Sequence, residues 1–167
     1  RIDPVGFAPA LLMEPVAPRT ADAVSGAFKL GNEFAVDHNS TTDGTNLLLI
    51  SPEPPGDYTS WATYEFPDLG MQPLALTVNA AYLVPNPHED LPDEGYWIAY
   101  ADYDKGVWQF SGPHRQGQSR VFIPPTTNVV SPGGFIYALV LTWGGTAAML
   151  KSVQMGYDAG VDYEESW

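Results

Sequence analysis

Three oxygen-rich stretches of the sequence carry the residue types that bind calcium. The first contains Asp102 and Asp104, the second contains Glu89, Asp90 and Asp93, and the third lies within residues 37–43. Calcium takes about six to eight oxygen ligands, several of them from carboxylates, and acidic loops supply such ligands. Simpler roles also suit these residues, because aspartate is common in hairpin turns and carboxylates are common in solvated loops. We therefore expect no cofactor, with a structural calcium ion as the open alternative.

Aromatic side chains gather in and near the strand-like segments around the first acidic stretch. The candidate ligand-binding residues are Trp61, Trp97, Tyr100, Tyr103 and Trp108. Exposed rings on a sheet can stack on the apolar side of sugar rings. Aromatic residues are also the ordinary filling of a β-sandwich core. An exposed row of rings would favour carbohydrate binding, whereas burial of the tryptophans would weigh against it.

Motifs for catalysis are absent from the sequence. The chain lacks the G-x-S-x-G nucleophile elbow, the H-E-x-x-H zinc helix and a glycine-rich phosphate loop. Its histidines, His38, His88 and His114, stand alone in loop-like contexts, where histidine is usually a solvated surface residue. We therefore name no catalytic residue and do not expect an enzyme. A hydrolase would require two close carboxylates or a serine–histidine pair assembled by the fold.

The chain is strongly acidic, with 20 Asp and Glu residues against 7 Lys and Arg residues and a formal net charge of −13. Such a surface repels phosphate backbones and anionic lipid headgroups, so we expect neither nucleic-acid binding nor membrane insertion. The longest apolar run, residues 135–143, is too short to span a bilayer.

Cysteine is absent, which excludes disulfides, thiol catalysis and thiolate metal sites. The chain begins with Arg1 rather than methionine, and removal of a secretory signal is one explanation. An acidic composition also keeps a secreted protein soluble. The absence of cysteine leaves the redox compartment open. From the start at Arg1 and the acidic composition we expect a secreted or extracellular location.

Residues 1–20 differ from the rest of the chain, because they carry four prolines, one of which, Pro9, lies within the apolar run 7–13. Proline lacks a backbone N–H and fixes φ, so we expect an extended arm with one short strand rather than a helix. Such an arm can add a strand to a neighbour's open sheet edge, or it can close its own sheet. The candidate assembly contacts are Phe7, Leu11, Leu12 and Met13. Residues 21–167 are then expected to form a single domain.

Beyond the arm, short apolar stretches rich in aromatic and β-branched residues alternate with turn signals, as in all-β proteins. The predicted strands are Phe34–Val36, Asn46–Ser51, Ser60–Phe66, Leu74–Val84, Tyr96–Ala101, Val107–Phe110, Arg120–Ile123, Phe135–Trp143 and Ala147–Met155. One-faced sheets bury their apolar faces by packing on each other. We therefore expect an all-β fold, an antiparallel β-sandwich of jelly-roll-like or immunoglobulin-like topology with an extended N-terminal arm.

Glycine-containing turns predict how the strands are connected. Trp143-Gly144-Gly145-Thr146, Asp104-Lys105-Gly106 and Asp43-Gly44 each suit a hairpin, because glycine adopts the positive φ that tight turns need. The long loop 85–95 is expected to connect strands across the two sheets.

Two of the predicted strands differ in their apolar pattern. Ser60–Phe66 alternates two sets of side chains, which predicts a half-exposed strand. Phe135–Trp143 is apolar on both faces and is expected at the centre of the core.

These features favour a non-catalytic extracellular module with a structural or adhesive role. The arm suggests a subunit of a larger assembly, with copies of itself or other extracellular proteins as partners. The alternative is a carbohydrate-binding module that binds glycans through exposed aromatic rings and holds a structural calcium ion. A hydrolase with an unrecognised site is the least favoured class.

Overall fold

The computed structural model describes residues 19–20, 29–30, 37–38, 40–42, 46–51, 59–83 and 95–158, which form strands, turns and irregular segments and include no helix. The strands are β1 (Arg19–Thr20), β2 (Lys29–Leu30), β3 (Asp37–His38), β4 (Ser40–Thr42), β5 (Leu47–Ile50), β6 (Thr59–Pro67), β7 (Gln72–Leu83), β8 (Tyr96–Asp102), β9 (Val107–His114), β10 (Gln118–Phe122), β11 (Phe135–Trp143) and β12 (Ala147–Asp158).

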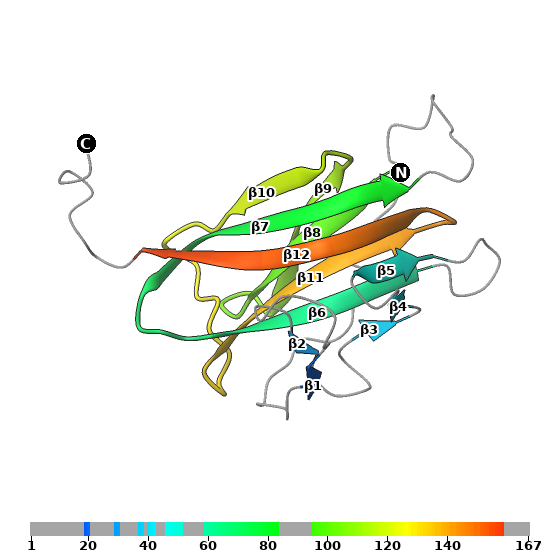
Figure 1. Cartoon of the computed structure of the whole chain (residues 1–167). Helices are drawn as coiled ribbons and strands as arrows, with labels where there is room; N and C mark the ends of the chain where they lie inside the picture. The colour runs from blue at the N-terminus through cyan, green and yellow to red at the C-terminus, as the bar shows by residue number, and fades with distance from the viewer. Residues whose placement is uncertain are drawn as a thin grey trace.

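Two five-stranded antiparallel sheets pack against each other (Figure 1). Sheet I has the strand order β10-β7-β12-β5-β4, and sheet II has the order β3-β6-β11-β8-β9. The short strands β1 and β2 pair with each other, and β2 lies beside β6 (Figure 1). The all-β sandwich expected from the sequence is confirmed.

The order of the last eight strands is that of a jelly roll. β5 pairs with β12, β6 with β11, β7 with β10, and β8 with β9, so the chain is folded like one long hairpin. Consecutive strands of this long hairpin lie in alternate sheets. The exception is β8 and β9, which are neighbours in sheet II. This arrangement decides between the two topologies that the sequence left open.

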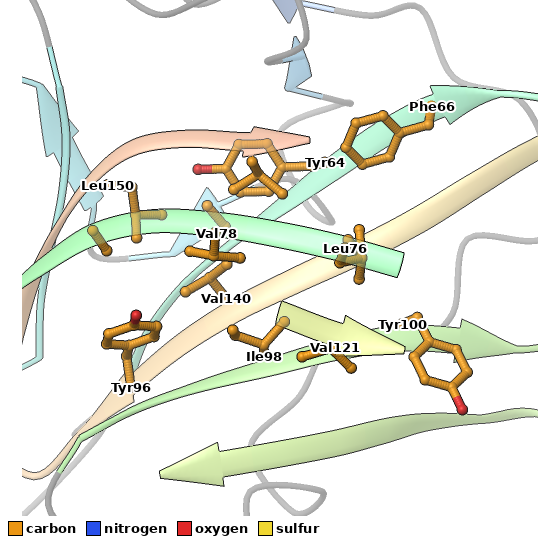
Figure 2. Close-up of a cluster of buried hydrophobic side chains, with 14 of the residues drawn as sticks. Tyr64, Phe66, Leu76, Val78, Tyr96, Ile98, Tyr100, Val121, Val140 and Leu150 are labelled. Atoms are coloured by element: carbon orange, nitrogen blue, oxygen red, sulfur yellow. The ribbon is translucent and has the colours of Figure 1, made fainter. Parts of the chain in front are cut away.

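The space between the sheets is filled by apolar side chains from both. Figure 2 shows Val78 of β7 and Val140 of β11 pointing into this space, with Tyr64 and Ile98 nearby. Tyr96, which is fully buried, donates a hydrogen bond through its hydroxyl to the carbonyl of Gln116 at 2.7 Å. That bond connects β8 of sheet II to the segment that leads into β10 of sheet I.

Most predicted strands are confirmed within a few residues, and β11 has the predicted bounds. β11 is also the central strand of sheet II, with Ile136 to Thr142 buried, as its apolar pattern predicts. The predicted strand Phe34–Val36 lies outside the described residues. The loop 85–95 connects β7 of sheet I to β8 of sheet II, which confirms the predicted crossing between sheets.

The prediction that Ser60–Phe66 is half-exposed is wrong. β6 is buried on both faces from Thr59 to Phe66, including Thr63 and Glu65. Period-two alternation of apolar and polar residues indicates which side chains share a face, but it does not show whether another layer covers the second face.

The tight turn at Trp143 to Thr146 is present, but the predicted hairpin pairing is wrong. Gly144 and Gly145 have φ values of +68° and +85°, and the Thr146 hydroxyl donates to the Trp143 carbonyl at 2.8 Å. The strands on either side then enter different sheets, because β11 pairs with β6 and β8 whereas β12 pairs with β5 and β7. The two glycines allow the chain to reverse direction, but they do not determine which strands pair with each other.

The other two turns agree with the predicted pairing. β8 and β9 form an antiparallel hairpin in which Gly106 has a φ of +70° and donates to the Asp102 carbonyl at 2.8 Å. β4 pairs with β5 in antiparallel register, although Asp43 and Gly44 lie outside the described residues.

Candidate functional site

The side of sheet II that faces away from the sandwich core is lined by aromatic and aliphatic side chains. This outer aromatic face consists of the buried residues Trp61, Trp97, Ala99, Ala101, Trp108, Tyr137, Leu139 and Leu141, with Tyr103, Phe110, Phe135 and Trp143 partly buried beside them. Strand register aligns these residues in rows across the sheet. Leu141 lies between Trp61 of β6 and Trp97 of β8.

The tryptophans of this face are packed rather than presented to solvent. Trp61 is 7% exposed, Trp97 is 4% exposed and Trp108 is 5% exposed. Gly112 lies so close to Trp97 that a Cβ there would stand 3.0 Å from Cε3 of the indole ring. These rings offer no free surface to a sugar, so this geometry weighs against the predicted use of the three tryptophans in glycan stacking.

The two tyrosines of the predicted ligand-binding set lie in different places. Tyr100 is part of the core between the sheets. Tyr103 follows β8 and lines an open cleft of about 400 Å³ together with Asn128, Val130, Ser131 and Pro132. Burial raises the pKa of Tyr103 to about 12.

A buried carboxylate lies on the outer aromatic face, where Glu65 is 4% exposed. The Tyr137 hydroxyl of the neighbouring strand donates to Glu65 Oε2 at 3.4 Å. Burial raises the pKa of Tyr137, and the nearby charge of Glu65 raises it further. Tyr137 therefore stays protonated and acts as a hydrogen-bond donor to Glu65. Sequence analysis gave no sign of this buried pair, because the pairing depends on the register of β6 and β11.

Asp102 is buried and its carboxylate is already occupied by N–H donors. Its Oδ1 accepts from the backbone N–H groups of Asp104 and Lys105 at 3.0 and 3.1 Å, and its Oδ2 accepts from the Gln109 amide at 2.9 Å. Burial acts to raise the pKa of Asp102, but these hydrogen bonds hold it below its ordinary value. In this arrangement Asp102 caps the β8–β9 turn.

The remaining predicted metal ligands do not gather around Asp102. Asp104 instead accepts a hydrogen bond from the backbone N–H of Asn128 at 2.9 Å, which joins the turn to the β10–β11 loop. Glu89, Asp90 and Asp93 lie outside the described residues. Within the described ranges, no three acidic or histidine side chains come together in a way that could hold a metal ion.

A serine–histidine contact occurs at the end of β9, where Ser111 Oγ lies 2.8 Å from His114 Nε2. Burial lowers the pKa of His114 below its ordinary value, and a hydrogen bond with the Ser111 backbone partly opposes this effect. A nucleophilic serine also needs a group that orients the base and donors for an oxyanion. The described contacts of the imidazole come instead from Ser111 and from the ring of Tyr96, 5.8 Å away between centroids. This pair therefore matches only one part of a hydrolase site.

The candidate assembly residues Phe7, Leu11, Leu12 and Met13 lie outside the described residues. The nearest described segments are β1 and β2, and β2 lies beside β6, the strand that carries Trp61. β2, and β1 through its pairing with β2, are thus located next to sheet II.

Sequence analysis missed an exposed set of polar and aromatic side chains on the opposite side of the molecule. It lies on the outer side of sheet I, across β10, β7 and β12. Phe122 is 69% exposed there, and the guanidinium carbon of Arg120 lies 5.4 Å from the centre of its ring. The short strand at Arg120 to Ile123 was predicted, but only the register of its neighbours shows which side chains surround Phe122.

Comparison with known proteins assigns no family to this chain. No protein-family model matches the sequence, and no curated protein matches it either. In the part of the chain that the structure describes, no helix has the length and apolar character needed to cross a membrane.

Proposed function

We propose that this chain is a non-catalytic extracellular jelly-roll module with a structural or adhesive role, and that copies of it associate through the N-terminal arm, residues 1–20. The observation that supports this proposal most directly is the burial of the outer aromatic face. In this proposal the arm supplies the layer that covers the face.

In an antiparallel sandwich, the face of a sheet that points away from the core is commonly polar and solvated. On sheet II, Tyr137 is 1% exposed, and Leu139 and Leu141 are fully buried within a single chain. Burial of one such side chain stabilises a protein by about 1.5–3 kcal/mol, so a face of this size is costly to leave in water. In this proposal the arm forms a covering layer on this face, either on its own chain or on a second copy.

The arm has the composition and the reach to form this layer. Phe7, Leu11, Leu12 and Met13 supply large apolar side chains. Residues 14–18 separate this run from β1, and an extended segment of that length spans about 17 Å. Crossing from β6 to β8 requires two strand spacings, or about 10 Å.

Exchange of the arm between copies requires no new contacts. An element that covers a face of its own chain covers the same face of an identical neighbour with the same residues. The connection to β1 is short and contains Pro15 and Pro18, whose fixed φ restricts how the arm can turn back. Short, restrained connections favour exchange between copies over closure within one copy.

The proposal is tested by light scattering of the full chain across a concentration series. We expect the molar mass to rise with concentration, and the double variant Leu11→Asp and Leu12→Asp to have a lower mass at every concentration. The charge introduced at these positions would have to be buried against apolar side chains, which is unfavourable.

The matched control is Ile2→Asp, which changes an apolar residue of the same arm outside the run 7–13. This variant is expected to associate like the unchanged chain. A chain that stays monomeric at all concentrations, or a control that dissociates as much as the double variant, would refute association through the arm.

A further inference from the structure

The outer side of sheet I presents three aligned rows of side chains across β10, β7 and β12. Strand register places Gln118, Asn79 and Ser152 in one row, Arg120, Thr77 and Gln154 in the next, and Phe122, Ala75 and Gly156 in the third. We call these nine residues the sheet I platform. Rows are about 6.7 Å apart and strands about 4.8 Å apart, so the platform measures about 13 by 10 Å between outermost Cα atoms.

The first row of the platform is held by side-chain hydrogen bonds across all three strands. The Gln118 amide donates to Asn79 Oδ1 at 3.2 Å, and the Asn79 amide donates to Ser152 Oγ at 2.8 Å. These bonds fix the orientation of polar groups before any ligand arrives, which reduces the entropy lost on binding.

A β-bulge in β12 brings Ser152 into this row. The register of β12 against β7 shifts between Leu150 and Ser152, so Lys151 is the extra residue. Leu150 points into the core, and without the bulge Ser152 would point there as well. Bulges of this kind often re-aim a side chain beside a functional site.

The third row ends in an aromatic ring that is mostly exposed to solvent. Phe122 is the most exposed of the large apolar side chains in the described residues, at 69%, and it has the small residues Ala75 and Gly156 beside it in the row. The neighbouring Arg120 guanidinium lies over the ring and adds hydrogen-bond donors next to it.

The charge of the platform differs from that of the chain as a whole. The chain has 20 acidic residues, but the described side chains of β7, β10 and β12 include no carboxylate. The charged side chains described on these three strands are those of Arg120 and Lys151, and both are exposed. The surface therefore does not repel a neutral or carboxylate-bearing ligand, and cations are not attracted to it.

We propose that the sheet I platform binds a polysaccharide. The ring of Phe122 stacks on the apolar side of one sugar unit, and the amides and hydroxyls of the other two rows exchange hydrogen bonds with the hydroxyls of adjoining units. A surface that combines an exposed ring, a guanidinium and pre-oriented amides matches the alternating apolar and hydroxyl surfaces of a sugar chain. This site lies on a different sheet from the outer aromatic face, and it does not depend on association through the arm.

The proposal is tested with the full chain by affinity electrophoresis in gels that contain one polysaccharide each. The probes are xylan, galactomannan, mixed-linkage β-glucan, starch and polygalacturonate, so that neutral and acidic sugars are both represented. We expect at least one probe to retard the chain. Phe122→Ala should weaken that binding by about tenfold or more, and Asn79→Ala should weaken it by about threefold to tenfold.

Two further variants separate binding from general surface effects. Phe122→Tyr keeps the ring and should retain retardation. Leu69→Ala removes a side chain that is 52% exposed outside the platform and should leave retardation unchanged. The proposal is overturned if no probe retards the chain, or if Phe122→Ala is retarded as strongly as the unchanged chain.

Discussion

Buried polar side chains in this jelly roll secure turns and strand ends. The Asp102 carboxylate accepts three N–H groups around the β8–β9 turn. The Tyr96 hydroxyl contacts the Gln116 carbonyl and also lies 2.9 Å from Ser119 Oγ. Each group would carry a desolvation penalty if it lost these partners, so the bonds help to specify one packing of the sheets.

The imidazole of His114 makes the stability of the fold depend on pH. Its pKa in the folded chain is lowered by burial below the ordinary value of 6.5. The unfolded chain therefore binds a proton more readily, and stability falls as the pH drops through 6.5 towards the folded pKa. We expect thermal melting at pH 7.5 and pH 5.5 to show a smaller acid-induced loss for His114→Gln than for the unchanged chain. Equal losses in the two proteins would show that another group controls this pH range.

The sequence identified the residue types of possible sites better than their roles. Asp102 was predicted as a metal ligand and Trp97 as a ligand-binding ring, because a carboxylate that binds calcium and one that caps a turn look alike in sequence, as do a ring that stacks on a sugar and one that packs. The difference for Asp102 comes from Gln109, whose amide reaches it only because β8 and β9 pair in this register. Phe122 was overlooked because a single aromatic residue in a short strand carries no sign of its exposure.

At the scale of strands, composition predicted most elements because aromatic and β-branched residues concentrate in them. Burial and connection were harder to predict. β6 has an alternating pattern, yet both of its faces are covered, and the two glycines before Thr146 join strands of different sheets. Both outcomes depend on contacts with segments distant in sequence, which local pattern does not contain.

The bulge in β12 is an element-scale feature with a testable consequence. It keeps both halves of the strand facing correctly, because Leu150 before it and Val153 after it both point into the core. Deletion of Lys151 would turn Val153 and Met155 to the opposite face, or else shift the first half of the strand. We expect this deletion to lower the free energy of unfolding in urea by at least about 3 kcal/mol.

The matched control for the deletion is Lys151→Ala, which keeps the extra residue and removes only an exposed charged side chain. Its effect should stay within about 0.5 kcal/mol. If the deletion were as stable as this control, the second half of β12 would not depend on the bulge for its orientation.

At the scale of the whole molecule, the two sheets have outer sides of opposite character. Sheet II carries buried tryptophans, tyrosines and leucines, whereas sheet I carries exposed amides, a guanidinium and a phenyl ring. We assign association to the first side and polysaccharide binding to the second. A module that associates through one side leaves the other free, and such an arrangement would increase avidity for a repetitive ligand.

Disulfide trapping tests the arm's place on sheet II most directly, because the chain contains no cysteine of its own. Thr63 is 2% exposed on the same strand face as Trp61, and Thr63→Cys would be combined in turn with cysteine at Phe7, Leu11, Leu12 or Met13. A disulfide forms only when the Cβ atoms come within about 3.5–4.5 Å. We predict that at least one pair is oxidised, with crosslinked dimers on non-reducing gels at high concentration, and that Leu69→Cys in place of Thr63→Cys gives none. Absence of any crosslink from all four arm positions would contradict the docking of the arm on the outer aromatic face.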